Sequence, residues 1–388
     1  MKIEAITIRE IRMPLVHFFE TSFGRTTERR ILLVTVHAQG VDGWGECTAG
    51  EHPFYNEESV DTAWYVTAGY LAPALLGQQI ESGRDCPALM NRVRAHRMAK
   101  AAVENAVWDA EAQIKNVPLW KLVGGTRMEL NAGVSIGIQE SPEQLLEKIA
   151  IELAAGYQRI KVKVKPGWDI NILEKIRNRW PEITLSCDAN SAYSLADIEH
   201  LKKFDKFGLL MIEQPLWNDD IYFHAQLQKQ LKTALCLDES IHQVRDAETA
   251  LALGACRIMN IKLGRVGGFT EAIAVHDACK KANVPVWCGG MLESGIGRVH
   301  NLAMSTLANF SLPGDVSASK RYWKEDIIEP EVEVSAKGTI TIPNSVGRGF
   351  RVREDLIERF TVRKQMLAQK IQSSRFQDMK VSRSELET

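Results

Sequence analysis

Short apolar runs alternate with amphipathic patterns of helical period through the middle of the chain. The helical patterns recur every 3.6 residues and separate the runs. Alternation of this kind is typical of a parallel sheet, and eight strands favour closure into a barrel. The predicted strands lie near 130–136, 160–164, 185–189, 209–213, 234–238, 257–263, 285–289 and 314–317, and the predicted helices cover 142–155, 170–179, 194–203, 221–231, 244–253, 268–282 and 298–307.

The ends of the chain have other patterns. Apolar residues alternate over 3–15 and return over 31–36, which predicts two strands joined by a loop over 17–29. Helices are expected over 71–76 and 98–114. Alternation around a Lys337-Gly338 turn over 332–342 is expected to rejoin the N-terminal domain, and 364–388 is polar and uneven, either a frayed helix or disordered.

Five ionisable residues close or follow the apolar runs at nearly constant intervals. Asp188, Glu213 and Asp238 are 25 residues apart, Lys163 lies 25 before the first, and Lys262 lies 24 after the last. A period of about 25 residues corresponds to one strand, one helix and two short loops. In a closed barrel, all five residues would therefore lie at the carboxyl-terminal rim, where such barrels carry their chemistry.

The three carboxylates suit Mg²⁺, which prefers a few hard oxygen ligands and leaves positions for substrate oxygens. Each acid alone could instead be a helix N-cap or an exposed charge beyond its strand. Three acids on one spacing favour the metal site. The absence of a His-x-His pair argues against a zinc hydrolase.

Lysines and valines alternate over 161–165. The alternative to a functional role is an amphipathic strand with a solvated face. Because the outer face of a barrel strand must be apolar, we expect Lys161 and Lys163 to point inward, where repulsion and a cation lower the pKa of a lysine base. Lys262 is expected to face Lys163 across the barrel mouth, with Arg265 lowering its pKa further; a salt bridge from Lys262 to a rim acid is the alternative.

The composition of the chain bears on its binding partners and on its cellular compartment. The chain has 388 residues and a formal net charge of −1, which gives no reason to expect nucleic acid or an anionic membrane as a partner. No run of 18 apolar residues is present, and an acid, Glu4, stands where a signal peptide would be apolar. Seven cysteines without a CxxC pair predict free thiols in the cytoplasm.

The residues at the regular spacing resemble the enolase superfamily, in its muconate-lactonising-like branch. Lys161, Lys163, the three acids and Lys262 match its motif position by position. Residues 163–169 (KVKPGWD), 262–268 (KLGRVGG) and 287–298 (WCGGMLESGIGR) are similar to the o-succinylbenzoate synthase/N-acylamino acid racemase group. The resemblance implies an α/β fold, a modified TIM barrel of the (β/α)7β type over 126–328. An α+β capping domain over 1–125 and 329–363 would cover it, with 364–388 as a C-terminal tail.

The resemblance also implies a mechanism. Asp188, Glu213 and Asp238 would hold Mg²⁺, which Mn²⁺ or Co²⁺ could replace, and an α-proton would leave a carboxylate substrate to form an ene-diolate. In the synthase reaction Lys163 removes the proton and then protonates the departing hydroxyl on the same face. In racemisation Lys163 and Lys262 work from opposite faces.

We therefore expect o-succinylbenzoate synthase activity, the dehydration of 2-succinyl-6-hydroxy-2,4-cyclohexadiene-1-carboxylate in menaquinone biosynthesis, together with N-succinyl or N-acylamino acid racemase activity. A dedicated N-acylamino acid racemase is the alternative, and Arg265 favours racemase competence. Dipeptide epimerases carry Asp-x-Asp at the eighth strand, whereas this chain has Asp315-Val316-Ser317. A non-catalytic scaffold would have lost one of the five groups, and none is lost.

Residues that bind substrate are harder to predict, and ordinary packing is the alternative for each. The loops 19–23 and 48–54 are expected to close over a small-molecule carboxylate, and the protein is expected to be a homo-oligomer. The candidates for substrate binding are Lys161, Asn190, Ser135, Met291, Ile296 and Tyr322, supported by Arg265 and Glu239.

Overall fold

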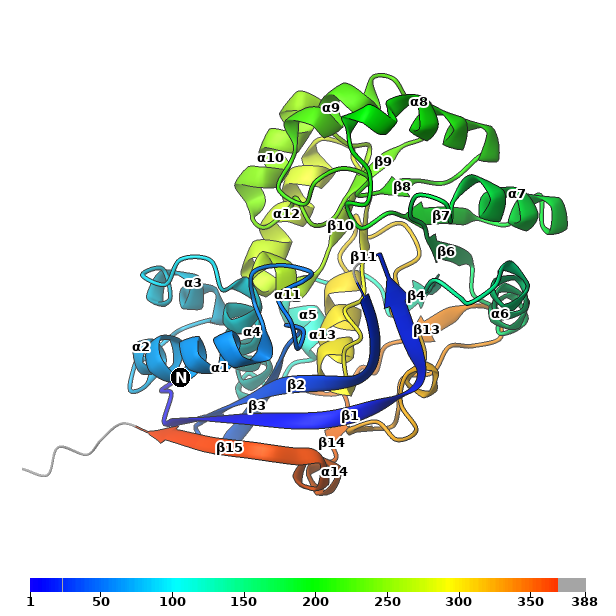
Figure 1. The fold of residues 1–388 in the computed structure, drawn as a ribbon. Coiled ribbons are helices and arrows are strands. Elements are labelled where there is room, and N and C mark those ends of the chain that lie inside the picture. Colours follow the sequence, from blue (N-terminus) through cyan, green and yellow to red (C-terminus); the bar gives the residue numbers. More distant parts are fainter. Residues whose placement is uncertain (23, 369–388) are drawn as a thin grey trace, which may run out of the picture.

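A parallel sheet of seven strands forms the centre of the molecule (Figure 1). The computed structural model describes residues 1–22 and 24–368. Neighbours in the sheet follow the order of the chain, as expected when each strand is joined to the next by a helical crossover. The strands are β5 (Gly133–Ile136), β6 (Arg159–Lys163), β7 (Leu185–Asp188), β8 (Ile212–Glu213), β9 (Leu235–Leu237), β10 (Ile258–Ile261) and β11 (Val286–Cys288).

Helices lie outside this sheet and follow its strands. The first of them begins where predicted, because the Ser141 hydroxyl accepts from the amide of Gln144 at 3.2 Å and a proline follows. After β7 the predicted single helix is broken into two 3₁₀ turns, η3 (Leu195–Asp197) and η4 (Lys202–Phe207), around α8 (Ile198–Leu201). The others are α6 (Pro142–Ala154), α7 (Ile170–Arg179), α9 (Tyr222–Gln228), α10 (Val244–Leu253), α11 (Leu263–Val266), α12 (Phe269–Lys281) and α13 (Gly295–Ser305).

The predicted eighth strand over 314–317 is wrong as a regular strand. Only Gly314 forms a bridge, to Ala132. The amide of Asp315 donates to the carbonyl of Cys288 at 2.8 Å, and the amide of Gly133 donates to the carbonyl of Gly314 at 2.7 Å. This segment therefore links β11 to β5, although Pro313, which lacks an N–H, and Gly314 weaken it as a strand.

Side chains alternate between the two faces of each barrel strand. Ile160, Val162 and Val164 are buried in the main core with the surrounding helices. Lys161 and Lys163, on the other face of β6, point into the barrel. There the Lys161 ammonium lies 4.6 Å from the centre of the Trp287 ring. The barrel interior has its own apolar cluster, made of Met211, Cys236, Ile258 and Trp287. The lysines of β6 thus point inward, as predicted from the apolar outer face.

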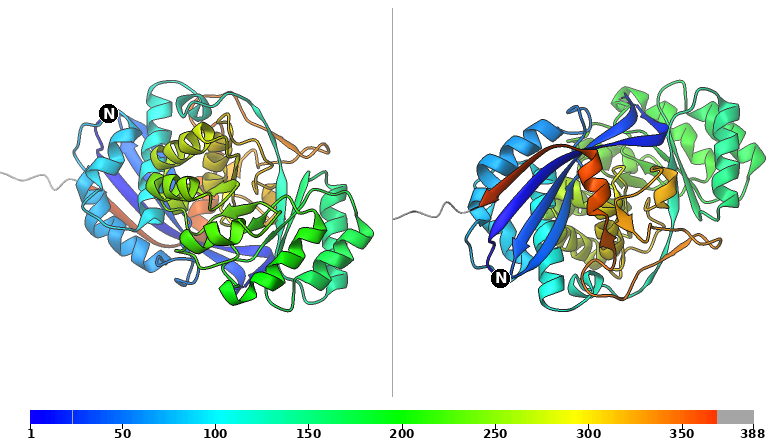
Figure 2. Two further views of the ribbon diagram at one scale, coloured as in Figure 1. Left: turned by 90° about the horizontal axis from the view of Figure 1, so that it is seen from above. Right: turned by 90° about the horizontal axis from the view of Figure 1, so that it is seen from below.

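A second, antiparallel sheet forms the cap in the order β15-β1-β2-β3. It consists of β1 (Ala5–Thr21), β2 (Gly24–Ala38), β3 (Val41–Cys47) and β15 (Thr361–Ala368). Figure 2 shows β15 beside β1, although they come from opposite ends of the chain. Helix α4 (Arg97–Ile114) packs so closely on β3 that a Cβ on Gly45 would lie 1.9 Å from the carbonyl oxygen of Ala102.

Smaller elements complete the cap and the connections. They are α1 (Val60–Val66), η1 (Thr67–Leu71), α2 (Ala72–Leu75), η2 (Gly83–Asp85), α3 (Cys86–Leu89), α5 (Leu119–Leu122), β4 (Glu129–Asn131), η5 (Ser319–Arg321), β12 (Ile328–Glu329), β13 (Thr339–Thr341), β14 (Arg351–Val352) and α14 (Glu354–Phe360). Within the described residues, no helix has the length and apolar character needed to cross a membrane.

Three predictions for the ends of the chain are wrong. The segment 17–29 is not a loop but the arms of a hairpin, in which Thr21 pairs with Gly24. The segment 332–342 contains β13, which pairs with β4 next to the barrel and not with the cap sheet. Residues 364–368 of the predicted tail belong to β15, whereas 369–388 lie outside the described residues.

Candidate active site

Three buried carboxylates lie at neighbouring strand ends. Asp188 closes β7 and pairs in register with Glu213, which closes β8. Glu213 pairs in turn with Cys236 of β9, so Asp238, two residues further on, is directed to the same interior face. Asp188 is 1% exposed, and Glu213 and Asp238 are 0% exposed.

Two lysines of β6 contact the first part of this group. The Lys161 ammonium lies 2.7 Å from Glu213 Oε2, 3.2 Å from Asp188 Oδ2 and 2.9 Å from Asp315 Oδ2. The Lys163 ammonium lies 2.6 Å from Asp188 Oδ2 and donates to Asn190 Oδ1 at 2.7 Å. Both lysines are buried, so their charges are balanced by these carboxylates rather than by water.

Lys262 reaches the group from its other end. It follows β10, and its ammonium lies 2.6 Å from Asp238 Oδ2 and 3.1 Å from the hydroxyl of Tyr55, a residue of the cap. The salt bridge from Lys262 to a rim acid, the alternative to a catalytic role for this lysine, is therefore present, with Asp238 as the acid. Gly289 makes room for Lys262, because a Cβ there would lie 2.6 Å from the Lys262 Cε. Lys163 and Lys262 thus contact the first and the last acid.

Charge and burial shift the pKa values in this group. Burial, together with the Asp188 and Asp238 carboxylates, raises the pKa of Glu213 to about 7. Burial also lowers the pKa of Lys262, but Asp238 and other neighbours raise it more, so it stands well above its ordinary range. The expected lowering of the Lys262 pKa is wrong for this arrangement, because Asp238 and other neighbours outweigh burial and raise it. The Arg265 guanidinium is itself paired with Asp238.

Ammonium groups take the places between the carboxylates. Within residues 1–22 and 24–368, no group of three or more His, Cys, Asp or Glu side chains has the arrangement of a metal site as the side chains stand. The donor set nevertheless fits Mg²⁺, since Asp188, Glu213 and Asp238 offer three hard oxygens from neighbouring strands. A bound cation would offset the repulsion that Asp188 and Asp238 exert on the Glu213 carboxylate.

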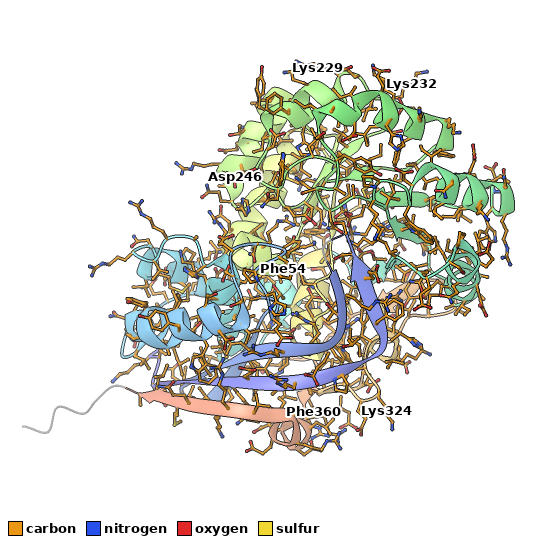
Figure 3. The ribbon with its side chains drawn as sticks, viewed as in Figure 1. Phe54, Lys229, Lys232, Asp246, Lys324 and Phe360 are labelled. Atoms are coloured by element: carbon orange, nitrogen blue, oxygen red, sulfur yellow. The ribbon has the colours of Figure 1, made fainter. Side chains whose placement is uncertain are left out.

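A cavity of about 510 Å³ is lined by Lys163 and Lys262. Both predicted cap loops contribute to its wall, with Phe19 and Thr21 from the first and Thr48, His52 and Phe54 from the second. Phe54, labelled in Figure 3, projects between the cap and the barrel and is 63% exposed. Phe23, part of the first predicted loop, lies outside the described residues.

The predicted binding residues are only partly brought together. Asn190 and Met291 line the cavity, and the Asn190 amide donates to Glu239 Oε1 at 2.8 Å. Ser135 pairs with Lys161 in the sheet but does not line the cavity.

Two other candidates lie elsewhere. Ile296 is fully buried in the core through α13, because its helix turns that side chain away from the cavity. Tyr322 lines a different cavity of about 580 Å³, together with residues of β1 and α6.

Four further polar residues hold the site together and were not predicted. Asn260 donates to Glu213 Oε1 at 2.7 Å, and the Gln214 side chain accepts from the amide of Asp238 at 2.9 Å. Asp315 pairs with Lys161 and with Arg159, and Tyr55 donates to Asp238 Oδ1 at 3.2 Å. Asn260 carried a usable signal, since it lies two residues before Lys262 and so faces the same side of β10.

Two domain families match this chain. Residues 2–124 match the mandelate racemase/muconate lactonizing enzyme N-terminal domain, and residues 144–356 match the enolase C-terminal domain-like family. The chain is a member of the enolase superfamily, of the type with these two domains.

Individual relatives narrow this class. The o-succinylbenzoate synthase of Geobacillus kaustophilus is 50% identical over 93% of this chain and 96% of its own length. The N-succinylamino acid racemase of Thermus thermophilus is 43% identical over 93% of this chain and 98% of its own length. A crystal structure of an enolase superfamily member from Listeria innocua superposes with a TM-score of 0.91 at 38% identity, covering 95% of this chain and 99% of the other.

Proposed function

We propose that this chain is a Mg²⁺-dependent enzyme that removes the α-proton of a carboxylate substrate. The observation that carries the proposal is the pair of buried lysines, Lys163 and Lys262, which reach one cavity from the two ends of a row of acids. Asp188, Glu213 and Asp238 would hold the ion, which when bound stabilises negative charge on the substrate carboxylate.

The primary reaction we propose is the dehydration of 2-succinyl-6-hydroxy-2,4-cyclohexadiene-1-carboxylate to o-succinylbenzoate. Lys163, as a neutral amine, accepts the proton from the carbon and then gives it to the departing hydroxyl, which leaves as water. Lys163 donates to Asp188 and Asn190 in this structure.

We also propose racemisation of N-succinyl or N-acylamino acids at the same site. In this reaction one lysine takes the α-proton and the other returns a proton to the opposite face. The support is twofold: a second ammonium at Lys262 and relatives at 43% identity named as N-succinylamino acid racemases. A dedicated racemase is the second candidate, because the same lysines and acids serve either reaction.

Turnover of both substrates in one preparation tests the proposal. The enzyme is first treated with EDTA and then assayed with added Mg²⁺, and metal binding is measured separately by calorimetry. We expect both activities with Mg²⁺ and neither without it. Racemisation alone would assign a dedicated racemase, and Mg²⁺ binding without either activity would contradict the proposal.

We place the enzyme in the cytoplasm, supported by the seven cysteines, which are all buried free thiols. Assembly as a homo-oligomer and the domain limits at residues 125 and 328 stay predictions.

A further inference from the structure

A buried charged cluster lies beside the cavity, where the cap meets the barrel. It consists of Arg29 of β2, Glu46 of β3 and Glu293 of the segment that joins β11 to α13. Arg29 and Glu293 are 7% exposed, and Glu46 is 2% exposed. Their hydrogen bonds go to the surrounding loops and to α13, apart from the acids and lysines of the candidate active site, so the proton-transfer chemistry does not account for them.

Glu46 fixes the cap to the start of α13. One carboxylate oxygen accepts from the amide of Ser294 at 3.0 Å, and the other accepts from the Ser294 hydroxyl at 2.5 Å and from the amide of Gly297 at 2.9 Å. A Cβ on Gly297 would lie 2.9 Å from both Glu46 Oε2 and Glu293 Cγ. The two carboxylates therefore lie side by side at the first turn of this helix.

Glu293 fixes the loop that ends at α13. Its side chain accepts from the amide of Met291 at 2.8 Å and from the Asn301 side chain at 2.9 Å. Its backbone carbonyl accepts from the Trp323 indole at 3.1 Å. Leu292, between the two anchored residues, has a left-handed φ of 55°, which is strained for leucine and is held only by its surroundings. Met291 and Leu292 both line the cavity.

Arg29 fixes the facing loop of the cap. Its guanidinium donates to the carbonyls of Thr48 and Ala49 at 3.2 and 3.3 Å, where the loop over 48–55 begins. Burial lowers the pKa of Arg29, and the carboxylates of Glu46 and Glu293 oppose this shift. One cluster therefore anchors both loops that wall the cavity, one from each domain.

We propose that Arg29, Glu46 and Glu293 are positioning residues. They set the separation between the cap loop 48–55 and the barrel loop 290–292, and thereby determine which substituents fit beside the reacting carbon. The choice of test substrates rests on the proposed function, but the placement of the loops does not.

Amide hydrogen exchange at Met291 tests the placement without substrate or metal. Glu293→Ala removes both carboxylate oxygens, so the amide of Met291 and the side chain of Asn301 both lose their acceptor. We expect exchange at Met291 to be faster by about tenfold or more. Unchanged exchange in this variant would overturn the proposal. If it does not fold, Asn301→Ala, which removes one donor to Glu293, replaces it in the comparison.

A matched pair of cap variants tests the effect on selectivity. Glu111 of α4 is also buried, at 3% exposed, and accepts from the amide of Gly83 at 2.6 Å and from the Ser82 hydroxyl at 3.1 Å, away from the cavity loops. We expect Glu46→Gln to raise KM roughly tenfold for at least one substrate, with a smaller change in kcat, and to shift the ratio of the two activities about threefold or more. Glu111→Gln should change neither the KM nor the ratio of the two activities.

The outcomes are distinguishable. Equal KM values and activity ratios in Glu46→Gln, Glu111→Gln and the unaltered enzyme would overturn the role in selectivity. If the unaltered enzyme turns over neither substrate, the proposed function fails, and exchange at Met291 still decides whether the cluster positions the loop.

Discussion

Replacing Lys163 by alanine removes the proposed base but leaves Asp188 paired with Lys161. Lys163 is 7% exposed and lies 2.6 Å from Asp188 Oδ2. Breaking a buried ion pair and leaving a lone charge costs about 3–5 kcal/mol. Asp188 keeps Lys161 at 3.2 Å, so it is not left without a partner. We therefore expect a smaller loss in the free energy of unfolding, about 1–3 kcal/mol, and a folded variant.

The loss of rate should be much larger than the loss of stability. A positioned general acid or base contributes about 10²–10⁴-fold, which corresponds to about 3–5 kcal/mol of activation free energy. In dehydration Lys163 acts twice, first as base and then as acid, so we expect a loss of at least about 10⁴-fold. Initial rates of dehydration and racemisation, measured at saturating Mg²⁺, give the loss for each reaction.

Lys165→Ala is the matched control. Lys165 lies two residues further along the same segment, but its side chain is 41% exposed and its carboxylate partner, Glu20, is 4.0 Å away. An exposed pair of this kind contributes about 0–1 kcal/mol, so both stability and rate should stay close to those of the unaltered enzyme. Substantial dehydration by a folded Lys163→Ala variant would refute the assignment of the base.

Three further predictions concern other parts of the site and the domain interface. Lys262→Ala should reduce racemisation by at least about 10³-fold and dehydration by less, because only racemisation needs a proton donor on the second face; equal losses in the two assays would contradict this. Gly289→Ala should destabilise the protein by about 1–3 kcal/mol in urea unfolding, because the added Cβ would lie 2.5 Å from the Asn260 amide and 2.6 Å from Lys262 Cε. Burial raises the pKa of Glu104 to about 7 in the folded protein, above the ordinary value of 4.5. The protonated Glu104 side chain should therefore stabilise the fold fully below pH 4.5, and this stabilisation should be lost as the pH rises through 7. Between about pH 5 and pH 8, the free energy of unfolding should fall less in Glu104→Gln than in the unaltered protein. An equal fall in both proteins would refute this.

The barrel and its row of charged residues were predictable because their signals are local. A strand that is apolar on one face and ends in a charged residue places that residue on the rim, whatever the rest of the fold does. This holds for Asp188, Glu213 and Asp238, whose inward direction follows from the period of two along each strand. The same period could have identified Asn260.

Features that depend on distant partners were not predictable in this way. Tyr55 reaches Asp238 only because the cap is folded over the barrel, and no pattern near Tyr55 indicates this. The hairpin over 17–29 is polar and partly exposed, so it lacks the apolar alternation that marks a strand. Ile296 was expected at the cavity from its place after the seventh strand, but the rotation of α13 directs it to the core.

The pairing of β15 with β1 makes the two ends of the chain depend on each other. Ala5 is opposite Ala368. During synthesis, the outer edge of β1 therefore stays unpaired until almost the entire chain has been made and β15 has left the ribosome. An unpaired strand edge is a template for association with other chains. The barrel can fold in that interval, but the cap sheet cannot be completed, and truncation before residue 361 would leave that edge permanently open.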